Sequence, residues 1–342
     1  MKTHKILIGL IAIILLGWSE QSSLLAQSKV GTTTAQFLTI PVGGEAIGLG
    51  GAYTAIANDA SALYWNPGAV SRTGKNAVYA SQTNWLVGSK HQWFGAKLMV
   101  TRQDAIGFSF NSLNYGAREK VTTVDEPDGT GEYWNASDLS LNLTYCRNLT
   151  DRFSIGGSLK YINQQIWHES ASGFAVDLGL LFITQFNELR IAATLTNFGG
   201  ELQLDGRDLL HRIDLDPQAS GNNETIVARL KTDSWPIPLT FHVGAAMPIL
   251  RSDNMTVTLA ADAVRPTDNT ETLNVGGSVE IMKILSLRGG YQTLFRNDSQ
   301  TGMTLGLGLR VPNPFADLKF DYAFQDFGLF GNIQSAGIGV SF

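Results

Sequence analysis

The stretch that decides the fold is Met303–Val311, which reads MTLGLGLRV. Apolar residues alternate there with Thr, Gly, Gly and Arg. Successive side chains of a β-strand point to opposite faces of a sheet, so this period of two predicts a strand with one apolar and one polar face. The same alternation occurs in DLKFDYAFQ (Asp317–Gln325) and in the final residues GIGVSF (Gly337–Phe342).

About fourteen such segments are expected between residue 76 and the end of the chain. They begin near residues 76, 90, 103, 133, 152, 170, 187, 237, 253, 270, 284, 300, 315 and 332. This spacing leaves no room for intervening helices, so neighbouring strands must be antiparallel. Segments of about 9–12 residues match tilted strands that cross a bilayer. The sequence therefore predicts an all-β fold, a 14-stranded antiparallel transmembrane β-barrel over residues 76–342.

Composition excludes several other classes. Of the 342 residues, 44% are hydrophobic and 16% are charged, which argues against intrinsic disorder. Beyond the N-terminus no run of about 18 apolar residues predicts a membrane helix. The formal net charge of -5 provides no basic surface for nucleic acid. Cys146 is the single cysteine, so an intramolecular disulfide is excluded, and we expect an inert thiol on the lumen face.

The connections between strands differ in length in a regular way. The two longest, about 117–132 and 199–236, both follow odd-numbered strands, whereas the turns near 148–151, 185–187 and 282–283 follow even-numbered ones. Outer-membrane barrels have long extracellular loops and short periplasmic turns, so we expect the long connections to face outside. The connection 199–236 is either a solvated loop or a docking surface for a protein partner. Within it, Leu209, Leu210 and Ile213 are expected to form one turn of amphipathic helix.

The two ends of the chain carry targeting features. Residues 1–26 read as a cleaved signal peptide, with Lys2 and Lys5 ahead of the apolar run Ile6–Trp18, which predicts export and an outer-membrane location. Phe342 ends the chain on the apolar face of the last strand and resembles the signal by which outer-membrane barrels are recognised for insertion. Interfacial aromatic girdles are expected at Trp85, Trp93, Tyr115, Tyr133, Trp134, Trp167, Trp235 and Tyr291.

Residues 27–75 do not alternate and are rich in small residues. Tight turns are expected at Gly48, Gly50, Gly51, Asn58, Asp59, Asn66 and Pro67. A small apolar segment ahead of a barrel with a polar lumen can fold into that lumen. We therefore predict an N-terminal hatch over residues 27–75, with the Asn66–Pro67 turn seated against lumenal charges. The glycines lack the preceding strand and the following Lys-Ser/Thr of a phosphate loop.

This segment also carries a family resemblance. EAIGLGGAYTAIANDASALYWNPGAV (Glu45–Val70) resembles the N-terminal hatch motif of the FadL-like barrels, closest to the PorV/PorQ branch, and VGTTTAQFLTIPV (Val30–Val42) is similar to the same branch. The resemblance implies a 14-stranded barrel and two functional classes. The first is a PorV/PorQ-like helper of type IX secretion or surface attachment, which binds secretion-system or cell-surface proteins. The second is a FadL-like channel for long-chain fatty acids or other hydrophobic compounds.

Strand parity predicts a charged lumen. Four cationic and four anionic residues fall on inward positions: Lys160, Asp262, Glu280, Arg288, Arg310, Asp317, Lys319 and Asp321. Charges under a plug tend to be paired, so we favour ion pairs that hold hatch and barrel together over a translocation path. A fatty-acid conduit should instead be apolar with one basic residue. On this argument the secretion helper is the first hypothesis and the hydrophobic channel the alternative.

No catalytic constellation is evident. The five histidines are scattered, and neither H-E-x-x-H nor G-x-S-x-G occurs. A barrel lipase or protease, with Ser or Asp and His at one rim, stays open as a minor alternative. We predict a non-enzyme without metal or cofactor, whose partners are membrane lipid, other proteins and a possible hydrophobic ligand.

Overall fold

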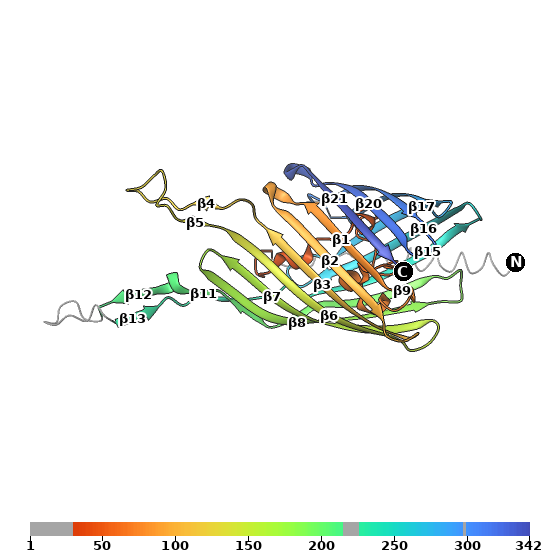
Figure 1. Cartoon of the computed structure of the whole chain (residues 1–342), viewed down its shortest axis with the longest axis horizontal. Helices are drawn as coiled ribbons and strands as arrows, with labels where there is room; N and C mark the ends of the chain where they lie inside the picture. Colours follow the sequence, from red (N-terminus) through yellow and green to blue (C-terminus); the bar gives the residue numbers. More distant parts are fainter. Residues whose placement is uncertain (1–29, 215–225, 297–298) are drawn as a thin grey trace, which may run out of the picture.

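The computed structural model describes residues 30–214, 226–296 and 299–342, and in them fourteen antiparallel strands close into a barrel (Figure 1). In order around the barrel the strands are Ala77–Asn84 (β1), Lys90–Met99 (β2), Asp104–Asn114 (β3), Ala136–Asn148 (β6), Phe153–Ile166 (β7), Glu169–Ile183 (β8), Arg190–Gly199 (β9), Thr240–Arg251 (β15), Met255–Pro266 (β16), Thr272–Ile281 (β17), Leu285–Leu294 (β18), Met303–Val311 (β19), Asp317–Asp326 (β20) and Asn332–Ser341 (β21). The last strand pairs with the first, with Ala77 opposite Ser341. The predicted fold is confirmed.

The alternation of side chains gives the barrel an apolar outer surface. On β19, Leu305 and Leu307 are about half exposed, whereas Thr304 between β18 and β20 is buried and faces inward. A closed barrel leaves no strand edge unpaired, which satisfies the backbone inside a bilayer. An apolar outer face on a closed antiparallel barrel is the architecture of outer-membrane proteins, and the fold indicates a protein of that membrane. Among the described residues no helix is both long and apolar enough to span a bilayer.

The two rims of the barrel are unlike. At the rim where β1 begins and β21 ends, which we call the terminal rim, the connections are short, as at 149–152 and 282–284. At the opposite rim, the hairpin rim, two ribbons extend beyond the barrel (Figure 1). They are formed by Glu119–Lys120 with Tyr133–Trp134 (β4, β5) and by Leu210–Ile213 with Ile226–Arg229 (β12, β13). Shorter pieces at this rim are Leu86–Gly88 (η3), Glu201–Gln203 (β10), Asp205–Gly206 (β11), Arg207–Leu209 (η4), Ser234–Pro236 (β14) and Gly328–Phe330 (η5).

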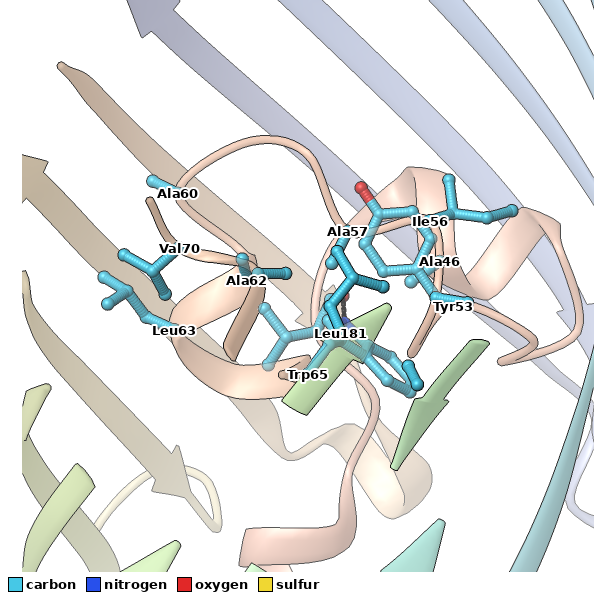
Figure 2. Packing of buried hydrophobic residues seen from close by; sticks show 14 of the residues in the cluster. Ala46, Tyr53, Ile56, Ala57, Ala60, Ala62, Leu63, Trp65, Val70 and Leu181 are labelled. Carbon is cyan, nitrogen blue, oxygen red and sulfur yellow. Dashed lines mark hydrogen bonds between the residues drawn. The ribbon is translucent and has the colours of Figure 1, made fainter. Parts of the chain in front are cut away.

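Residues 30–75, here called the inner segment, run through the lumen. They form the short helices Gln36–Thr39 (η1), Gly44–Gly48 (α2), Ala62–Trp65 (α3) and Pro67–Ala69 (η2). The segment enters at the hairpin rim, where the Thr34 amide donates to the Pro236 carbonyl at 2.9 Å. It leaves at the terminal rim, where Asn76 exchanges two backbone hydrogen bonds with Phe342. Its apolar side chains pack with inward residues of the wall such as Leu181 (Figure 2).

Some sequence expectations about local structure are wrong. Leu210–Ile213 is a strand paired with β13 rather than part of an amphipathic turn, because the ladder to Ile226–Arg229 satisfies its backbone; only Arg207–Leu209 forms a 3₁₀ turn. Trp93 is buried and faces the lumen beside Tyr79, with ring centroids 6.3 Å apart, so it is no part of an interfacial girdle. Trp85, also expected in a girdle, packs instead against a buried cluster inside the barrel. The signal peptide predicted over residues 1–26 lies outside the described residues.

Candidate functional site: the filled lumen and its cavities

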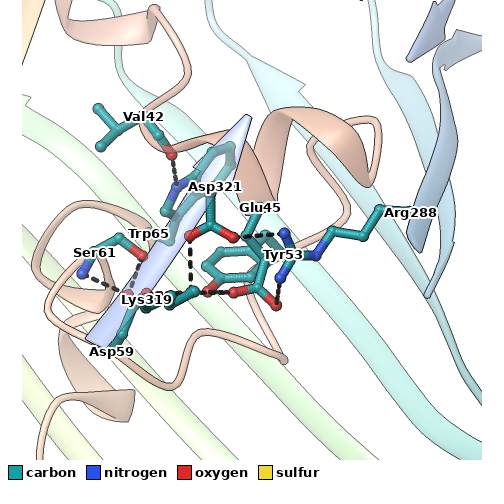
Figure 3. Close-up of polar contacts among 9 residues, drawn as sticks. All are labelled: Val42, Glu45, Tyr53, Asp59, Ser61, Trp65, Arg288, Lys319 and Asp321. Carbon is teal, nitrogen blue, oxygen red and sulfur yellow. Dashed lines mark hydrogen bonds and ion pairs between the residues drawn. The ribbon is translucent and has the colours of Figure 1, made fainter. Parts of the chain in front are cut away.

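A cluster of buried charges joins the inner segment to the barrel wall (Figure 3). The Lys319 ammonium of β20 contacts the carboxylates of Glu45, Asp59 and Asp321, at 2.6 Å from Asp59 and 3.3 Å from Asp321. The Arg288 guanidinium of β18 lies 2.6 Å from Asp321 and 3.3 Å from Glu45. Two wall cations therefore hold two carboxylates of the inner segment, and the charges are paired as burial requires.

The cluster changes the acidity of the inner-segment carboxyls. Burial by itself raises the pKa of Glu45, but the charges of Arg288 and Lys319 outweigh it and lower that pKa to about 2. The pKa of Asp59 is also lowered: burial opposes the shift, and the Lys319 charge and hydrogen bond overcome it. Both groups therefore stay ionised in the folded protein at any neutral or mildly acidic pH.

These shifts predict how acid affects the seating of the inner segment. Because the pKa of Glu45 falls from 4.5 to about 2 on folding, its contribution to stability is complete above pH 4.5 and is lost as the pH falls toward 2. We expect hydrogen-exchange protection of residues 44–65 to be constant from pH 7 to pH 5 after correction for intrinsic exchange rates, and to fall below pH 4.5. Glu45→Gln should show a weaker acid dependence. Equal protection of the wild type at pH 5 and pH 2 would contradict the assignment.

The three carboxylates of the charge cluster also lie close enough together to suggest a metal site. Among the described residues they form the one group of this kind. Oxygen atoms of Glu45, Asp59 and Asp321 lie within 4.8 Å of one another. The Lys319 ammonium contacts all three, so it already supplies the cation at the point they share. The arrangement fits an internal ion pair network and does not fit a metal centre.

Glycines seat the inner segment against one side of the wall. A Cβ on Gly48 would lie 2.8 Å from the Gly306 Cα, and a Cβ on Gly50 would lie 2.8 Å from the Tyr291 amide nitrogen. Gly50 also has φ +66°, a conformation that other residues rarely adopt. From the wall side, a Cβ on Gly276 or Gly290 would meet the backbone of the inner segment at 2.3–2.4 Å. Backbone therefore packs on backbone, with no space for a side chain.

A second glycine pair receives the turn at Asn66–Gly68. Gly156 and Gly179 are register partners on β7 and β8, and a Cβ on Gly156 would lie 2.3 Å from the Pro67 carbonyl oxygen. The Asn66 side chain accepts from the Gly68 amide and donates to the Leu180 carbonyl at 3.2 Å. This turn was expected to rest against lumenal charges. That expectation is wrong, because the close approach of its backbone to the wall requires glycines there.

A third contact region lies near the middle of the barrel. The Lys160 ammonium is 2.8 Å from Asp177 and donates to Asn197 at 2.6 Å. The ladder between β8 and β9 shifts register beside Asp177, and the Asn197 amide donates to that carboxylate at 2.8 Å. On β16, two strands from β9, Asp262 accepts from the backbone amides of Tyr53 and Thr54, so a barrel carboxylate orients the inner segment.

The remaining predicted residues lie apart from these contacts. Asp317 pairs with Lys75 at 2.7 Å near the terminal rim. Asn58 lines a cavity of 270 Å³ at this rim together with Arg310, and Asp59 and Lys319 of the charge cluster border the same cavity. Gly51 has φ +77° and faces the Asn274 side chain. Glu280 is half-buried on β17, opposite Thr256 and Ser286. Cys146 is buried, with Sγ 3.1 Å from the Ser71 hydroxyl.

Two adjoining cavities open toward the hairpin rim. The outer one, of 660 Å³, has apolar side chains such as Phe37, Trp85 and Phe327 in its lining, together with polar ones such as Gln325 and the charged Arg296. The rings of Trp85 and Phe327 meet edge to face with centroids 5.4 Å apart. The inner one, of 240 Å³, has Tyr64 and Trp65 in a lining that is otherwise largely polar and includes Lys160 and Asp268. Six residues line both cavities: Gln36, Thr39, Pro41, Asn269, Gln292 and Thr293.

Sequence reasoning missed several residues of these sites. Lys97 is buried and donates to the Val70 carbonyl at 3.1 Å, and Asp177 is the partner of Lys160. Strand parity, which found the other lumenal charges, also places these two inward. Glu45 lies in the aperiodic inner segment, where no pattern marks it as an ion-pair partner.

Comparisons with known proteins identify the fold. No protein-family model matches the chain, and no curated protein matches its sequence. Solved structures do match: the CymD monoaromatic hydrocarbon channel, with 13% identity over 88% of this chain and 96% of that one, has a TM-score of 0.54. The toluene transporter TodX of P. putida, with 11% identity over 88% and 96%, has a TM-score of 0.52.

A FadL homologue from Pseudomonas aeruginosa is similar to the same extent, with 12% identity over 88% of this chain and 97% of that chain and a TM-score of 0.50. At such low identity the likeness establishes a shared barrel fold. The chain therefore has the fold of FadL-type outer-membrane barrels.

Proposed function

We propose that this protein is an outer-membrane channel for small hydrophobic compounds, with the inner segment as its plug. The observation that carries the proposal is the pair of adjoining cavities at the hairpin rim. The apolar side of the outer cavity, formed by residues such as Phe37, Trp85 and Phe327, suits a compact hydrophobic ligand, and binding sites for such ligands are concave and mostly apolar. The three structural neighbours named above are a monoaromatic hydrocarbon channel, a toluene transporter and a FadL homologue, which supports the same class of cargo.

The charges of the Arg288–Lys319 cluster do not oppose this function, because they lie away from the cavities along the barrel axis. Lys160 does line the inner cavity, where it is paired with Asp177 at 2.8 Å. Arg288, Lys319 and Asp321 lie in the half of the barrel near the terminal rim and form ion pairs with one another. The half near the hairpin rim holds a cluster of buried apolar residues that includes Phe37, Leu113, Ile162 and Ile237, among others. A hydrophobic ligand would thus meet apolar side chains of the wall and of the inner segment, such as Leu113 and Phe37, before it meets the buried ion pairs. Passage beyond the cavities requires the inner segment to rearrange.

Uptake of a labelled hydrocarbon tests the proposal. Cells or proteoliposomes containing the wild-type protein should take up radiolabelled toluene faster than matched samples without it. The double variant Trp85→Ala/Phe327→Ala removes the facing aromatic rings and should reduce the initial rate several-fold, because burying an aromatic ring contributes about 1.5–3 kcal/mol. Trp134→Ala, an exposed aromatic on β5 outside both cavities, is the matched control. Labelled long-chain fatty acid, used in parallel, reports which hydrophobic class is carried.

The proposal fails if neither toluene nor fatty acid enters faster with the protein than without it. It also fails if Trp134→Ala reduces uptake as much as the loss of Trp85 and Phe327.

A second candidate function rests on a different observation, the ribbons that project beyond the hairpin rim. Leu210, Ile226 and Val227 of β12–β13 are exposed, and a two-stranded ribbon offers unpaired edges to a partner strand. This favours protein binding, as in a PorV/PorQ-like helper of secretion or surface attachment. Affinity purification from native outer membranes tests it. Shortening the β12–β13 ribbon should then release a co-purifying surface protein and leave hydrocarbon uptake unchanged.

A further inference from the structure

We propose that the outer wall of the barrel carries a specific phospholipid site, with an acyl chain over Gly157 and the phosphate on Arg147. The site lies on the membrane face, outside the lumen, and is independent of the channel function. A groove of 520 Å³ marks it, lined by β6, β7, β8, β9 and β15.

The groove arises from one missing side chain in a row of outward residues. The strand registers align Tyr145, Gly157, Leu178, Leu195 and Phe241 across five neighbouring strands. Four of these residues carry large side chains that stand out from the wall. Gly157 carries none, and a Cβ placed there would reach only ordinary contact, 3.4 Å from the Asp177 carbonyl oxygen and 3.6 Å from a Leu178 methyl. The row therefore has a gap about one side chain wide.

The wall is also thin at this point. The neighbouring Gly156 and Gly179 face inward and have no side chains because the backbone of Pro67–Gly68 packs against them. The inner segment accounts for the inward glycines but has no contact with the outward Gly157. Unlike the outward pair Gly277 and Gly289, Gly157 lies in a groove that also contains a cation, Arg147. The absent side chain at Gly157 is the feature that a ligand on the membrane side would explain.

Arg147 supplies a cation at one end of this groove. It is an outward residue one position before the end of β6, so it lies near the terminal rim. An arginine on the lipid face is costly at the bilayer midplane and tolerated near the headgroups. Its side chain is 50% exposed, and its nearest carboxylate, Asp104, is 3.6 Å away and already accepts from the Tyr145 hydroxyl at 2.7 Å. The guanidinium can therefore receive a phosphate, whose geometry it matches.

The location and chemistry together specify the occupant. The groove faces bilayer hydrocarbon, so an acyl chain fills it, and the cation stands at headgroup depth, so the chain belongs to a lipid with an anionic phosphate. A neutral hydrocarbon would leave Arg147 unused. A soluble anion would leave the apolar groove empty.

Native mass spectrometry of the detergent-purified full chain, titrated with dioleoyl phosphatidylglycerol, tests the site. Gly157→Leu fills the gap and should weaken the tightest phospholipid-binding step about ten-fold, the effect expected for the lost burial of one or two methylenes. Gly289→Leu is the matched control, an outward glycine on β18 whose nearest atoms would be 4.0 Å from the new Cβ. Arg147→Gln should weaken the same step by a smaller factor. Heat-modifiable migration confirms that each variant is folded.

Three results would overturn the proposal. One is equal phospholipid affinity for wild type, Gly157→Leu and Gly289→Leu. Another is an Arg147→Gln variant that binds phosphatidylglycerol as tightly as the wild type. This variant tests the phosphate contact separately, because it leaves the groove over Gly157 unchanged. The third is displacement of the bound lipid by saturating toluene, which would assign the groove to the hydrocarbon cargo instead.

Discussion

Valine in place of Gly290 is expected to prevent the inner segment from seating and to remove most of the folded barrel, whereas valine at Gly289 leaves the barrel intact. A Cβ at Gly290 would lie 2.4 Å from the Gly50 amide nitrogen and from the Leu49 carbonyl carbon. Both are backbone atoms, so no side-chain rotation relieves the overlap. Overpacking of a side chain costs about 1–3 kcal/mol, and a clash with fixed backbone costs more.

The neighbouring glycine, Gly289, provides a matched control for the substitution at Gly290. Gly289 differs from Gly290 by one position on β18 and faces outward, where a Cβ would stay 4.0 Å from Leu305 and Thr304. Both variants carry the same change in strand propensity and backbone freedom. Heat-modifiable migration on gels measures the folded fraction, and limited proteolysis of residues 30–75 measures seating. If the two valines give equal folded fractions and equal protease resistance, backbone-to-backbone packing does not position the inner segment.

The barrel itself was predictable because its signal is local and repeated. Each strand, such as Met303–Val311, must show an apolar face to lipid and another face to the lumen, so the period of two is imposed by the surroundings. The closing pair of β1 and β21 follows from that pattern, since a membrane strand cannot leave an edge unpaired. Strand parity likewise identified Arg288, Lys319 and Asp321 as inward residues.

The arrangement inside the lumen was not predictable in the same way. Glu45 and Asp59 lie in a segment without periodicity, and their partners are more than 200 positions away in the chain. Strand parity places charged residues on the lumen face, but it does not show which of them are paired or which of them line a cavity. For that reason the balanced charge set suggested a lumen unsuited to hydrophobic compounds, whereas the structure places two cavities with aromatic residues in their linings near the hairpin rim, away from the Arg288–Lys319 cluster.

Several glycines of the inner segment pack against the barrel wall, a role that the expectation of tight turns did not include. Gly48 and Gly50 were expected to be turn residues, and Gly50 does have a positive φ. Their closest contacts, however, are with the wall, at Gly306 and Tyr291. Register-paired inward glycines such as Gly276 with Gly290 are the signal that could have located these contacts, because a barrel wall without side chains at two adjacent positions leaves space for another backbone.

Replacing Lys319 by methionine is expected to destabilise the folded protein by about 3–5 kcal/mol, the cost of leaving a buried charge without its partner. The ammonium contacts three carboxylates, and only Arg288 remains to compensate Glu45 and Asp321 when it is lost. Methionine keeps much of the side-chain length, so the effect reports charge rather than a cavity. Chemical unfolding in detergent micelles or liposomes measures it.

Two further variants separate this effect from general fragility. Lys75→Met removes a cation whose pair with Asp317 is largely exposed at the terminal rim, and such pairs contribute about 0–1 kcal/mol, so it should unfold nearly as the wild type does. Adding Asp59→Asn to Lys319→Met removes one uncompensated carboxylate and should recover part of the lost stability. If Lys319→Met and Lys75→Met unfold alike, or if Asp59→Asn gives no recovery, the buried charges do not hold the inner segment. Recovery of stability in the double variant cannot come from restored packing, because neither substitution adds a contact. It can come only from removal of the negative charge on Asp59 that Lys319 had neutralised.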